Sequence, residues 1–562
     1  MAATRNFSKL SQNRYDLLII GGGITGACIA RDAAQRGLTV ALVEAKDFCH
    51  ATSAATTKLV HGGLRYLENF EFGLVRESLR ERRAWQTIAP HMVKPLPFIV
   101  PTYGHGRRGR LRLDIGLTLY DILSFDRNRL DDPNQHLPGH RDLSTEDVLK
   151  LAPGLKRERL TGGMIYYDCQ MYAPERIGLE CLLDAHAKGA HVVNYAKVIK
   201  IHRHGKQVTG ARVKDELAGD QIDVTATVTV NAAGPWADEL AAQAEGGPSC
   251  VRLIRSKGIH LITWPIMHRH ALTIFAEHSH VFILPWRGHS IIGTTDTIFD
   301  GDPNQVHATE EDIHALLTLV NETYPGARLR RSHVLHTYAG LRPLVDNSGG
   351  GPHSTDSYRA SRKSEICDHQ RQSGLENFVS AVGGKWTTSR RTAEKVVDLI
   401  LRKLKRNQVP CRTHETPLPG GETGRFSIYL DEAIRLHAHL PAAIVTHLAR
   451  TYGSRLDRVI DQSAQDVEMV SPHLLDLTAQ VSYAVREEMA VTLEDVIYRR
   501  TGLGTLCHPG VAALDKAARL MAPELGWDDG EIARQIKNVQ SRLTVAHAVE
   551  PQQSLARDTI TS

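Results

Sequence analysis

The sequence predicts an α/β fold in which a Rossmann-like nucleotide-binding domain carries an inserted antiparallel-sheet domain and is followed by an all-helical domain. The first 44 residues read as strand, glycine-rich turn, helix and strand, which is how a nucleotide-binding unit begins. Two further strands, at 224–231 and 377–382, each lead into another glycine-containing turn. Strand patterns at 280–294 indicate antiparallel pairing, and residues 425–545 have mostly helical periodicity.

Length and composition limit the class of protein. A chain of 562 residues predicts two to four domains, because single domains typically span roughly 100 to 200 residues. The net charge of +5 permits anionic ligands or lipid surfaces without demanding nucleic acid, so we expect no nucleic-acid partner. The 8 cysteines form no C-x-x-C pair and predict reduced thiols in a cytoplasmic compartment. No apolar run approaches the roughly 18 residues of a spanning helix, so membrane contact would be peripheral.

Changes in composition predict the domain boundaries. Residues 409–424 are typical of a linker, and residues 345–364, rich in glycine and serine, are typical of a loop. We divide the chain into a flexible tail at 1–14, the nucleotide-binding domain with its interleaved substrate domain at 15–408, the linker at 409–424, the helical domain at 425–550 and a second flexible tail at 551–562. The insertions that form the interleaved domain are expected at about 93–160 and 260–340.

A dinucleotide-binding fingerprint follows the first strand. Gly21, Gly23 and Gly26 fit G-x-G-x-x-G at the start of a helix. The first glycine permits a tight turn, the second lets the backbone approach a pyrophosphate, and the third packs the helix on the strand. Glu44 ends the second strand, where a carboxylate accepts hydrogen bonds from a ribose and repels the 2′-phosphate of NADP. The contacts predicted for this unit are Gly21, Gly22, Gly23, Ile24, Thr25, Gly26 and Glu44.

The fingerprint alone leaves NAD and FAD open, and two later turns favour FAD. A flavin must be held along its length, so further glycines should permit close approach downstream, as at 232–234 and 383–385. The positive end of a helix expected near Thr387 would face the flavin N1 and C2=O region, where negative charge collects on reduction. Lys385 would add a fixed positive charge there.

Six motifs in order then identify a family. They are GGGITG with Glu44, ATSAATTKLVHGGLRYLE, NAAGPW, IIGTTD, YAGLRPL and GGKWTT. Together they closely resemble the FAD-dependent glycerol-3-phosphate dehydrogenase family, of the aerobic, respiratory bacterial type, over residues 14–545. The resemblance implies oxidation of sn-glycerol 3-phosphate to dihydroxyacetone phosphate, with hydride passing from substrate C2 to flavin N5 and electrons then going to a membrane quinone. It also implies a cytoplasmic protein held peripherally on the inner membrane; a homodimer is compatible with the sequence, which fixes no oligomeric state.

The resemblance implies the residues of the site as well. Two arginines from distant segments, Arg65 and Arg342, suit a phosphate dianion, because the rigid guanidinium fork holds it in one orientation. The implied substrate contacts are Arg65, Tyr66, His260, Arg342, Lys385 and Thr387, of which His260, Arg342 and Lys385 are assigned to catalysis. The implied cofactor contacts beyond the fingerprint are Ser53, Thr57, Lys58, His61, Gly62, Gly63, Val198, Ala233, Gly234, Trp236, Gly384, Lys385, Trp386 and Thr387.

The run TTKLVHGGLRYL, at 56–67, is interpreted as the seam between cofactor and substrate. Gly62 and Gly63 are expected to let the backbone pass close to the flavin ring, because glycine has no side chain to collide with it. Lys58 and His61 are expected beside the ring.

Oxidation of an alcohol carbon also requires the hydroxyl proton to leave. His260 is the first candidate for this base, because the ordinary pKa of histidine lies near neutrality. The alternatives are that His260 only hydrogen-bonds substrate or flavin, or that it is a core histidine. For Arg65 and Arg342 the alternative is a structural ion pair.

We predict no metal site. The H-x-H pairs at 268/270, 278/280 and 437/439 have no third ligand and no H-E-x-x-H pattern. The segment at 527–535 lacks the D-x-[DN]-x-[DN]-G spacing of a calcium loop, so calcium control is not expected.

Residues 103–129 are predicted to form an amphipathic helix in a lipid interface, close to where a quinone would be met. They carry six arginines against three aspartates around an apolar middle. One face carries Leu111, Ile115, Leu119, Ile122 and Leu123, with Leu113, Leu117 and Tyr120 on its flank. The alternative is a packed core helix with solvated ends.

Three other functions stay open. A glycerol-3-phosphate oxidase would use oxygen as the acceptor and produce hydrogen peroxide, although the amphipathic segment favours the quinone enzyme. An amine or amino-acid oxidase would suit the same fold, although the cationic candidates favour a phosphate substrate. A flavoprotein that mainly binds RNA should have denser lysine and arginine clusters than the C-terminal domain has.

Overall fold

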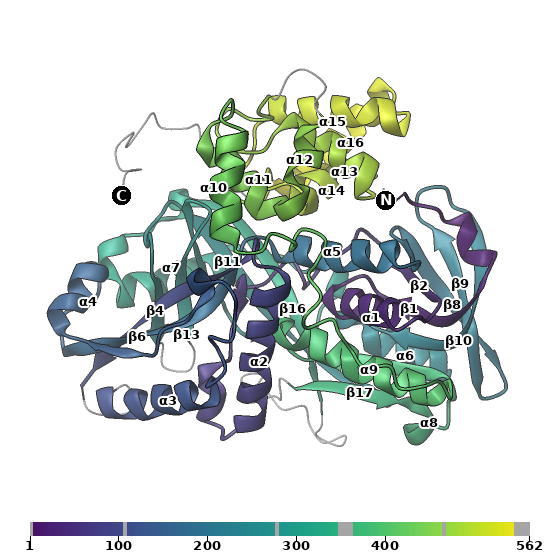
Figure 1. The fold of residues 1–562 in the computed structure, drawn as a ribbon, viewed down its shortest axis with the longest axis horizontal. Helices are drawn as coiled ribbons and strands as arrows, with labels where there is room; N and C mark the ends of the chain where they lie inside the picture. Colours follow the sequence, from purple (N-terminus) through teal and green to yellow (C-terminus); the bar gives the residue numbers. More distant parts are fainter. Residues whose placement is uncertain (1–3, 105–108, 276–279, 347–362, 463–467, 544–562) are drawn as a thin grey trace.

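The computed structural model describes residues 4–104, 109–275, 280–346, 363–462 and 468–543. Two sheets lie side by side, and the C-terminal helices lie across the top of both (Figure 1). The predicted tail at 551–562 and most of the predicted loop at 345–364 fall outside the described residues. Within the described part of the chain, no helix is both long and apolar enough to cross a membrane.

The first sheet is built on five parallel strands, whose residues are apolar because helices or strands cover both faces. Its order is β17-β18-β10-β1-β2-β7, with β9 paired to β10 and β8 paired to β9. The parallel strands are β1 (Arg14–Ile20), β2 (Val40–Val43), β7 (His191–Val193), β10 (Gln221–Asn231) and β18 (Phe378–Gly383). The antiparallel strands are β8 (Ala196–His204), β9 (Gln207–Asp215) and β17 (Ser364–Asp368).

Alternate residues of β1 pack on opposite faces of this sheet. Leu17 and Ile19 pack with α1 (Ile24–Gln35), α5 (Pro174–Ala187) and α9 (Ser389–Lys403). Leu18 and Ile20 pack with α6 (Ala237–Glu245) and with strands β8 and β9. The carboxyl ends of β1, β2, β10 and β18 therefore share one edge, which is where parallel α/β sheets bind nucleotides.

The second sheet has ten strands in the order β15-β11-β14-β13-β12-β4-β6-β3, with β16 paired to β11 and β5 to β6. The strands are β3 (Leu59–Val60), β4 (Val93–Tyr103), β5 (Arg141–Leu143), β6 (Leu160–Met171), β11 (Leu253–Thr263), β12 (Ala271–Phe275), β13 (His280–Trp286), β14 (His289–Gly293), β15 (Thr297–Ile298) and β16 (Val334–Val345). Helices α2 (Phe72–Ile88) and α3 (Arg110–Leu123) pack on one face, and α4 (Thr145–Leu151) and α7 (Glu310–Thr323) on the other. The predicted strands at 280–285 and 290–294 are β13 and β14, and they pair antiparallel as expected.

The C-terminal domain is helical, as the periodicity predicted. Its α-helices are α10 (Phe426–Leu436), α11 (Ala442–Tyr452), α12 (Leu456–Ile460), α13 (Thr478–Glu487), α14 (Leu493–Asp495), α15 (Val511–Leu525) and α16 (Asp529–Leu543). A π-helical turn, Val496–Arg500, continues α14 toward the first sheet domain. Its last residue, Arg500, donates to both carboxylate oxygens of Asp47 at 2.7 and 2.8 Å, so the helical domain is tied to the loop after β2.

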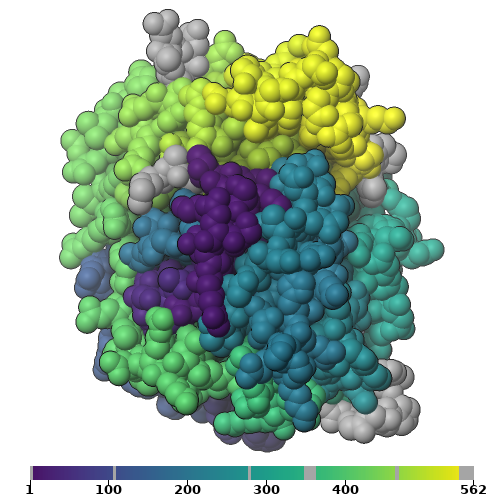
Figure 2. Space-filling model, turned by 90° about the vertical axis from the view of Figure 1, so that its right-hand side faces the viewer, coloured from purple at the N-terminus to yellow at the C-terminus, as the bar shows by residue number. Residues whose placement is uncertain are grey.

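The N-terminal segment differs from the predicted flexible tail. From residue 4 onward it packs on the first sheet, with Phe7 and Leu10 buried in the same core as β1. Arg5 pairs with Asp215 of β9 at 2.8 Å. In Figure 2 this purple segment lies against teal residues and beneath the yellow C-terminal helices. A few apolar side chains within a polar stretch were enough to anchor it, which composition alone did not reveal.

The segment predicted as a linker at 409–424 is also packed onto the first domain. Leu418 is buried in the core that contains α1 and α5. Arg31, on α1, donates to the carbonyl oxygens of Thr413 and Thr416 at 3.0 and 2.6 Å. The backbone carbonyls of this segment thus accept the hydrogen bonds of a buried arginine, and these bonds hold the segment against α1.

Candidate active site

A cavity of about 1640 Å³ is lined by residues of both sheets. Gly21, Glu44, Ala233 and Gly384 line it from the turns that follow β1, β2, β10 and β18. Residues of β11 and β16 line it from the second sheet. The volume exceeds that of a typical small-molecule pocket, roughly 300 to 1,000 Å³, and suits a dinucleotide together with a small substrate.

The glycines of the fingerprint act as predicted at the two positions where geometry requires them. Gly21 has φ +114°, and a Cβ there would lie 2.4 Å from the carbonyl oxygen of Ala232. A Cβ on Gly26 would lie 1.9 Å from the carbonyl oxygen of Gly21, so only glycine lets α1 pack this closely on β1. Gly23 caps the N-terminus of α1 and lines the cavity, where the helix end favours an anion.

Glu44 and Ser53 are fixed around this helix end by backbone hydrogen bonds. The Glu44 carboxylate accepts from the amide of Gly22 at 2.7 Å and from that of Lys46 at 2.9 Å. The Ser53 hydroxyl accepts from the amide of Ile24 at 2.9 Å. Both side chains line the cavity in set orientations, as a ribose and pyrophosphate site requires.

The turn after β18 forms a second part of the cavity. Gly384 has φ +83°, a conformation that favours glycine. Thr387 is buried; its hydroxyl accepts from the amide of His61 at 3.2 Å, and its carbonyl accepts from the indole of Trp85 at 2.9 Å. The indole nitrogen of Trp386, which lines the cavity, is buried without a hydrogen-bond partner among the described residues. A buried donor of this kind fits a site built for a polar ring system.

His260 lies on β11 and faces the cavity. Its Nε2 lies 3.0 Å from the hydroxyl oxygen of Thr57, and its ring stacks on Tyr338 at 4.7 Å. Burial first, and then the positive charges of Arg342 and Lys58, hold the pKa of His260 well below the ordinary value of histidine. The pKa of His260 in the folded protein therefore lies below the ordinary value on which the base assignment rested, and the imidazole is held in its neutral form.

Arg342 lies on β16, and its guanidinium is oriented mainly by uncharged oxygens. It donates to the hydroxyls of Ser256 and Thr294 at 3.0 and 2.8 Å and to the carbonyl of Thr295 at 3.2 Å. The carboxylate of Asp296 lies 4.0 Å away. Sequence reasoning gave no role to Thr294 and Thr295, although the motif IIGTTD that contains them was one of the six.

The two other predicted cations, Arg65 and Lys385, meet at Tyr66. The Lys385 ammonium lies 4.3 Å from the centre of the Tyr66 ring, and the Arg65 guanidinium lies 5.6 Å from it. Gly63 has φ +79°, and a Cβ there would lie 2.3 Å from the same ring. The structure brings all six predicted substrate contacts to the lining of one cavity. They are Arg65, Tyr66, His260, Arg342, Lys385 and Thr387.

Lys58 and Gly62 do not line the cavity with the other predicted contacts. The buried Lys58 ammonium donates to the carbonyl of Ala54 at 2.8 Å and lies 3.5 Å from Glu175, so it balances a buried carboxylate. A Cβ on Gly62 would lie 2.3 Å from the hydroxyl of Tyr120, so this glycine makes room for a tyrosine of α3. Gly22 and Gly26 also lie behind the lining and shape the turn.

The remaining predicted cofactor contacts line the cavity. They are Ile24, Thr25, Thr57, His61, Val198, Gly234 and Trp236. Val198 comes from β8, far from the fingerprint in sequence; β8 begins just after β7, the neighbour of β2, and the amide of Ala196 at its start donates to the carbonyl of Glu44 at 2.7 Å.

The cavity opens beside an exposed apolar surface on α3. The side chains of Leu111, Ile115 and Ile122 are 74%, 61% and 62% exposed, whereas Leu117 and Tyr120 are buried. Three residues of the face predicted to meet lipid therefore point outward, whereas Leu119 and Leu123 of the same face pack on the core with the flank. Ile115 also lines the cavity, as do Phe70 and Phe72 from the segment before α2. Two of the predicted arginines, at 107 and 108, fall outside the described residues.

Similar proteins share this whole architecture. The chain matches the FAD dependent oxidoreductase family over residues 16–399 and the C-terminal domain of alpha-glycerophosphate oxidase over 411–532. It is 36% identical to the glycerol-3-phosphate dehydrogenase of Synechocystis sp. over 551 residues, covering 95% of this chain and 97% of that protein. It is 35% identical to glycerol-3-phosphate dehydrogenase 2 of Mycobacterium tuberculosis over 547 residues, covering 96% and 89%.

A solved structure agrees over the same length. The glycerol-3-phosphate dehydrogenase of Bacillus halodurans, complexed with FAD, superposes with a TM-score of 0.75 at 30% identity and covers 98% of both chains. Sequence and structure thus agree across both domains, and the glycine turns and fixed Glu44 fit FAD. The chain belongs to the FAD-dependent glycerol-3-phosphate dehydrogenase family.

Proposed function

We propose that this protein oxidises sn-glycerol 3-phosphate to dihydroxyacetone phosphate with FAD and passes the electrons to a membrane quinone. The observation that carries the proposal is the convergence of Arg342, Lys385 and a neutral His260 in the same cavity as the dinucleotide-binding turns. The cavity thus offers positive charge for a phosphate group, a neutral imidazole for an alcohol and glycine-containing turns for a dinucleotide cofactor.

The cofactor would be held by the turns after the parallel strands. Gly21 and Gly23 would admit the pyrophosphate at the start of α1, and Glu44 would accept from the ribose. Trp386 and Thr387 belong to the part of the cavity that would take the flavin ring. When bound, FAD supplies the acceptor for the hydride that leaves substrate C2.

The phosphate of the substrate would be held by Arg342, with Arg65 and Lys385 adding positive charge. Ser256, Thr294 and Thr295 set the plane of the Arg342 guanidinium before substrate arrives. A guanidinium that is already oriented loses little conformational entropy when it binds a phosphate. It also fixes the position of the reacting carbon of the substrate.

His260 would take the hydroxyl proton. Its low pKa keeps the ring neutral, so a nitrogen with a lone pair is present over the physiological pH range, although the same burial makes it a weaker base than a free imidazole. Thr57 and the stacked Tyr338 hold the ring in one orientation. The neutral form would also avoid repelling Arg342, whose charge is needed for the phosphate.

Electron transfer to a quinone is supported by the apolar surface next to the cavity. Leu111, Ile115 and Ile122 form one exposed face of α3, and exposed Phe70 and Phe72 stand at the cavity. An apolar face of this kind beside a redox site suits peripheral contact with lipid on the cytoplasmic side of the inner membrane, where a quinone would be met.

Anaerobic titration of the purified protein with glycerol 3-phosphate tests the reaction. We expect the visible absorption of the bound flavin to bleach and to return when a quinone is added. Absence of bleaching would contradict the proposed substrate. Rapid recovery with oxygen alone, with stoichiometric hydrogen peroxide, would instead identify the oxidase alternative.

A His260→Asn variant tests the base. We expect turnover to fall by about 100-fold or more, because proton abstraction by a positioned side chain contributes roughly 10² to 10⁴ in rate. FAD content should be unchanged. A turnover rate and pH profile like those of the parent would remove His260 from the chemistry.

A triple variant, Leu111→Ser with Ile115→Ser and Ile122→Ser, tests the lipid surface. We expect it to lose cosedimentation with vesicles of anionic phospholipid while it keeps activity with a water-soluble electron acceptor. The matched control is Ile428→Ser with Leu436→Ser, which removes two exposed apolar residues of α10. Equal vesicle binding by the triple variant and the parent would contradict the proposed orientation.

A further inference from the structure

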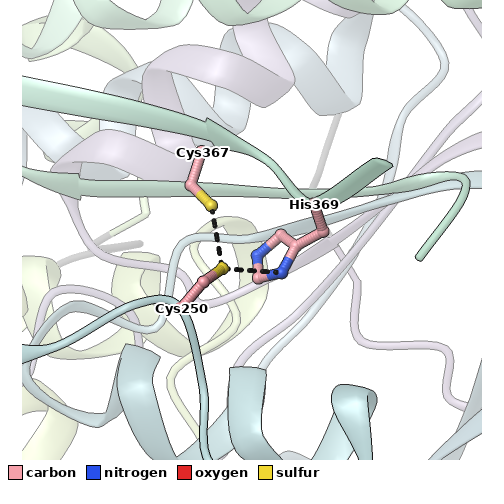
Figure 3. A group of neighbouring side chains, drawn as sticks. All are labelled: Cys250, Cys367 and His369. Carbon is pink, nitrogen blue, oxygen red and sulfur yellow. Dashed lines mark hydrogen bonds between the residues drawn. The ribbon is translucent and has the colours of Figure 1, made fainter. Parts of the chain in front are cut away.

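Four side chains that can bind a metal ion meet in the first sheet domain, outside the residues that line the cavity. They are Glu245 at the end of α6, Cys250 in the loop that follows, Cys367 on β17, and His369 at the start of α8 (His369–Gln372). Figure 3 shows Cys250, Cys367 and His369 pointing toward one another. Three of the four are inside the protein, and Cys250 reaches solvent.

The ligand atoms of Cys250, Cys367 and His369 all lie within 4.8 Å of one another, which suits a single small cation, and Glu245 lies close to Cys250 and His369. Cys250 Sγ lies 3.4 Å from Cys367 Sγ, 3.5 Å from His369 Nδ1 and 3.2 Å from Glu245 Oε1. In a tetrahedral zinc site with ordinary bond lengths, pairs of ligand atoms lie about 3.3 to 3.8 Å apart. Both pairs that involve Glu245 Oε1 are closer, at 3.2 Å to Cys250 Sγ and 2.7 Å to His369 Nδ1, so the carboxylate would move outward to admit an ion.

The surroundings orient the histidine for this role. His369 Nε2 lies 2.8 Å from the hydroxyl oxygen of Ser380 on β18, which leaves Nδ1 directed at Glu245, 2.7 Å away, and at the sulfur of Cys250, 3.5 Å away. Metal-binding histidines typically use their second nitrogen in such a hydrogen bond, because it fixes both the tautomer and the ring orientation. The Ser380 hydroxyl in turn accepts a hydrogen bond from the side-chain amide of Asn231 at 3.1 Å.

We propose that Glu245, Cys250, Cys367 and His369 form a structural site for a zinc ion or a similar thiophilic divalent cation. Two sulfurs, one imidazole and one carboxylate give a complete tetrahedral set with no open position, which is typical of structural rather than catalytic zinc. A disulfide between the cysteines would use only two of the four groups and would leave His369 and Glu245 paired with each other, whereas a metal ion would use all four. The exposed side of Cys250 gives the ion a path from solvent.

The site would brace the two turns that line the cofactor cavity. Glu245 and Cys250 follow the turn at 232–236 through α6, and Cys367 and His369 precede the turn at 383–387 through β18. One ion would therefore join the segments behind both turns. The inference is independent of the proposed substrate and of the electron acceptor.

Metal binding to the full-length protein tests the proposal. The protein would be reduced, stripped with a chelator and desalted without oxygen, and then titrated with Zn²⁺ in competition with a chromogenic chelator. We expect one tightly bound equivalent per chain. Co²⁺ in place of Zn²⁺ should give the visible bands of tetrahedral cobalt with thiolate ligands, at longer wavelength than flavin absorbs.

Three variants identify the ligands. Cys250→Ser, Cys367→Ser and His369→Gln should each abolish the tight equivalent and the cobalt bands, while FAD content reports that the fold is kept. Cys507→Ser, a partly buried cysteine of the helical domain, is the matched control and should bind metal like the parent. The proposal would be overturned if the parent bound no tight equivalent of Zn²⁺. It would also be overturned if the double variant, Cys250→Ser with Cys367→Ser, still bound one. Zn²⁺ should also raise the melting temperature of the parent and not that of Cys250→Ser.

Discussion

Arginines serve two different purposes at the domain interface and in the cavity. At the interface, Arg500 and Arg499 donate to the buried carboxylate of Asp47 at 2.5 to 2.8 Å. In the cavity, Arg342 donates to the hydroxyls of Ser256 and Thr294 at similar distances. Both guanidinium arrangements are fixed by short contacts, but the hydrogen-bond acceptors are carboxylates at the interface and uncharged oxygens in the cavity, where the carboxylate of Asp296 lies 4.0 Å from Arg342.

This difference separates stability from binding. A carboxylate cancels the charge of an arginine, so the interface arginines join two domains and attract no further anion. Hydroxyl and carbonyl oxygens orient Arg342, and the Asp296 carboxylate at 4.0 Å lies beyond hydrogen-bonding distance, so the guanidinium remains suited to a phosphate. The nature of the acceptor, more than burial or distance, indicates which arginines bind a ligand.

Removing the carboxylate at the interface should have the largest effect. Asp47→Asn removes the carboxylate partner of buried Arg500, whereas Arg499 keeps its pair with Asp495, and breaking a buried pair in this way typically costs about 3 to 5 kcal/mol. We expect a clear fall in the thermal unfolding midpoint with little change in the Michaelis constant of the folded fraction.

The control for this change is an exposed pair in the same helical domain. Glu524→Gln removes the partner of Arg486 at the surface, where ion pairs contribute roughly 0 to 1 kcal/mol. If Asp47→Asn and Glu524→Gln lowered the thermal unfolding midpoint by the same amount, the interface ion pairs would not contribute the free energy of unfolding that we attribute to them.

Removing the guanidinium of the cavity should affect binding and spare the fold. For Arg342→Ala we expect kcat/KM for glycerol 3-phosphate to fall about 100-fold, because charge-assisted contacts contribute up to about 3 kcal/mol. The Michaelis constant should carry most of the change, and FAD content should match the parent. Arg519→Ala, on the exposed face of α15, is the control. An unchanged Michaelis constant would mean that the phosphate binds elsewhere.

Replacing Arg342 by lysine keeps the positive charge and removes the planar guanidinium, so it separates the effect of charge from that of orientation. In Arg342→Lys an ammonium replaces the guanidinium, so attraction for phosphate persists while the contacts to Ser256 and Thr294 cannot all form. We expect roughly a tenfold loss in kcat/KM, between the parent and Arg342→Ala. A lysine variant as impaired as the alanine variant would show that orientation dominates over charge.

Mild acid should weaken the second sheet region before the interface. Burial, and secondarily Lys58, lowers the pKa of His336 on β16 to about 4, whereas an unfolded histidine binds its proton near pH 6.5. This histidine therefore costs no stability above pH 6.5 and about 1 kcal/mol per unit as pH falls from there toward 4. Burial would raise the pKa of Asp47, but Arg500 and Arg499 hold it below its ordinary value, so its contribution is lost only in stronger acid.

The melting temperature measured from pH 7.5 to 5 checks this order. It should fall with acid in the parent and more gently in His336→Gln, which has no proton to take up. Identical slopes in the two proteins would contradict the assignment to His336.

The parts of the site that the sequence predicted well are those set by local geometry. The glycines of the first turn, Glu44 and the turn at 383–387 each follow a strand directly, so pattern alone placed them at one sheet edge. Lys58 was expected beside the flavin because it precedes a glycine pair. Its partner Glu175 is 117 positions away, and no local pattern reveals such a pair.

Long-range pairing also explains the other differences. The metal-ligand cluster joins Cys250 to Cys367 and His369 over more than a hundred positions, so neither segment shows ligand spacing by itself. The N-terminal segment looked like a tail because only Phe7 and Leu10 are apolar anchors, and their burial depends on a sheet assembled from distant strands. Local periodicity predicts elements, whereas charge balance in a core is a property of the complete fold.

The position of Asp47 links the helical domain to the cofactor without direct contact. Asp47 lies between Glu44 and Ser53, both of which line the cavity, and it is clamped from the far side by Arg499 and Arg500. Opening of the helical domain would release this loop and loosen the grip on the dinucleotide in one cooperative step. Flavin fluorescence during heating should thus report the melting of helices that never touch the flavin.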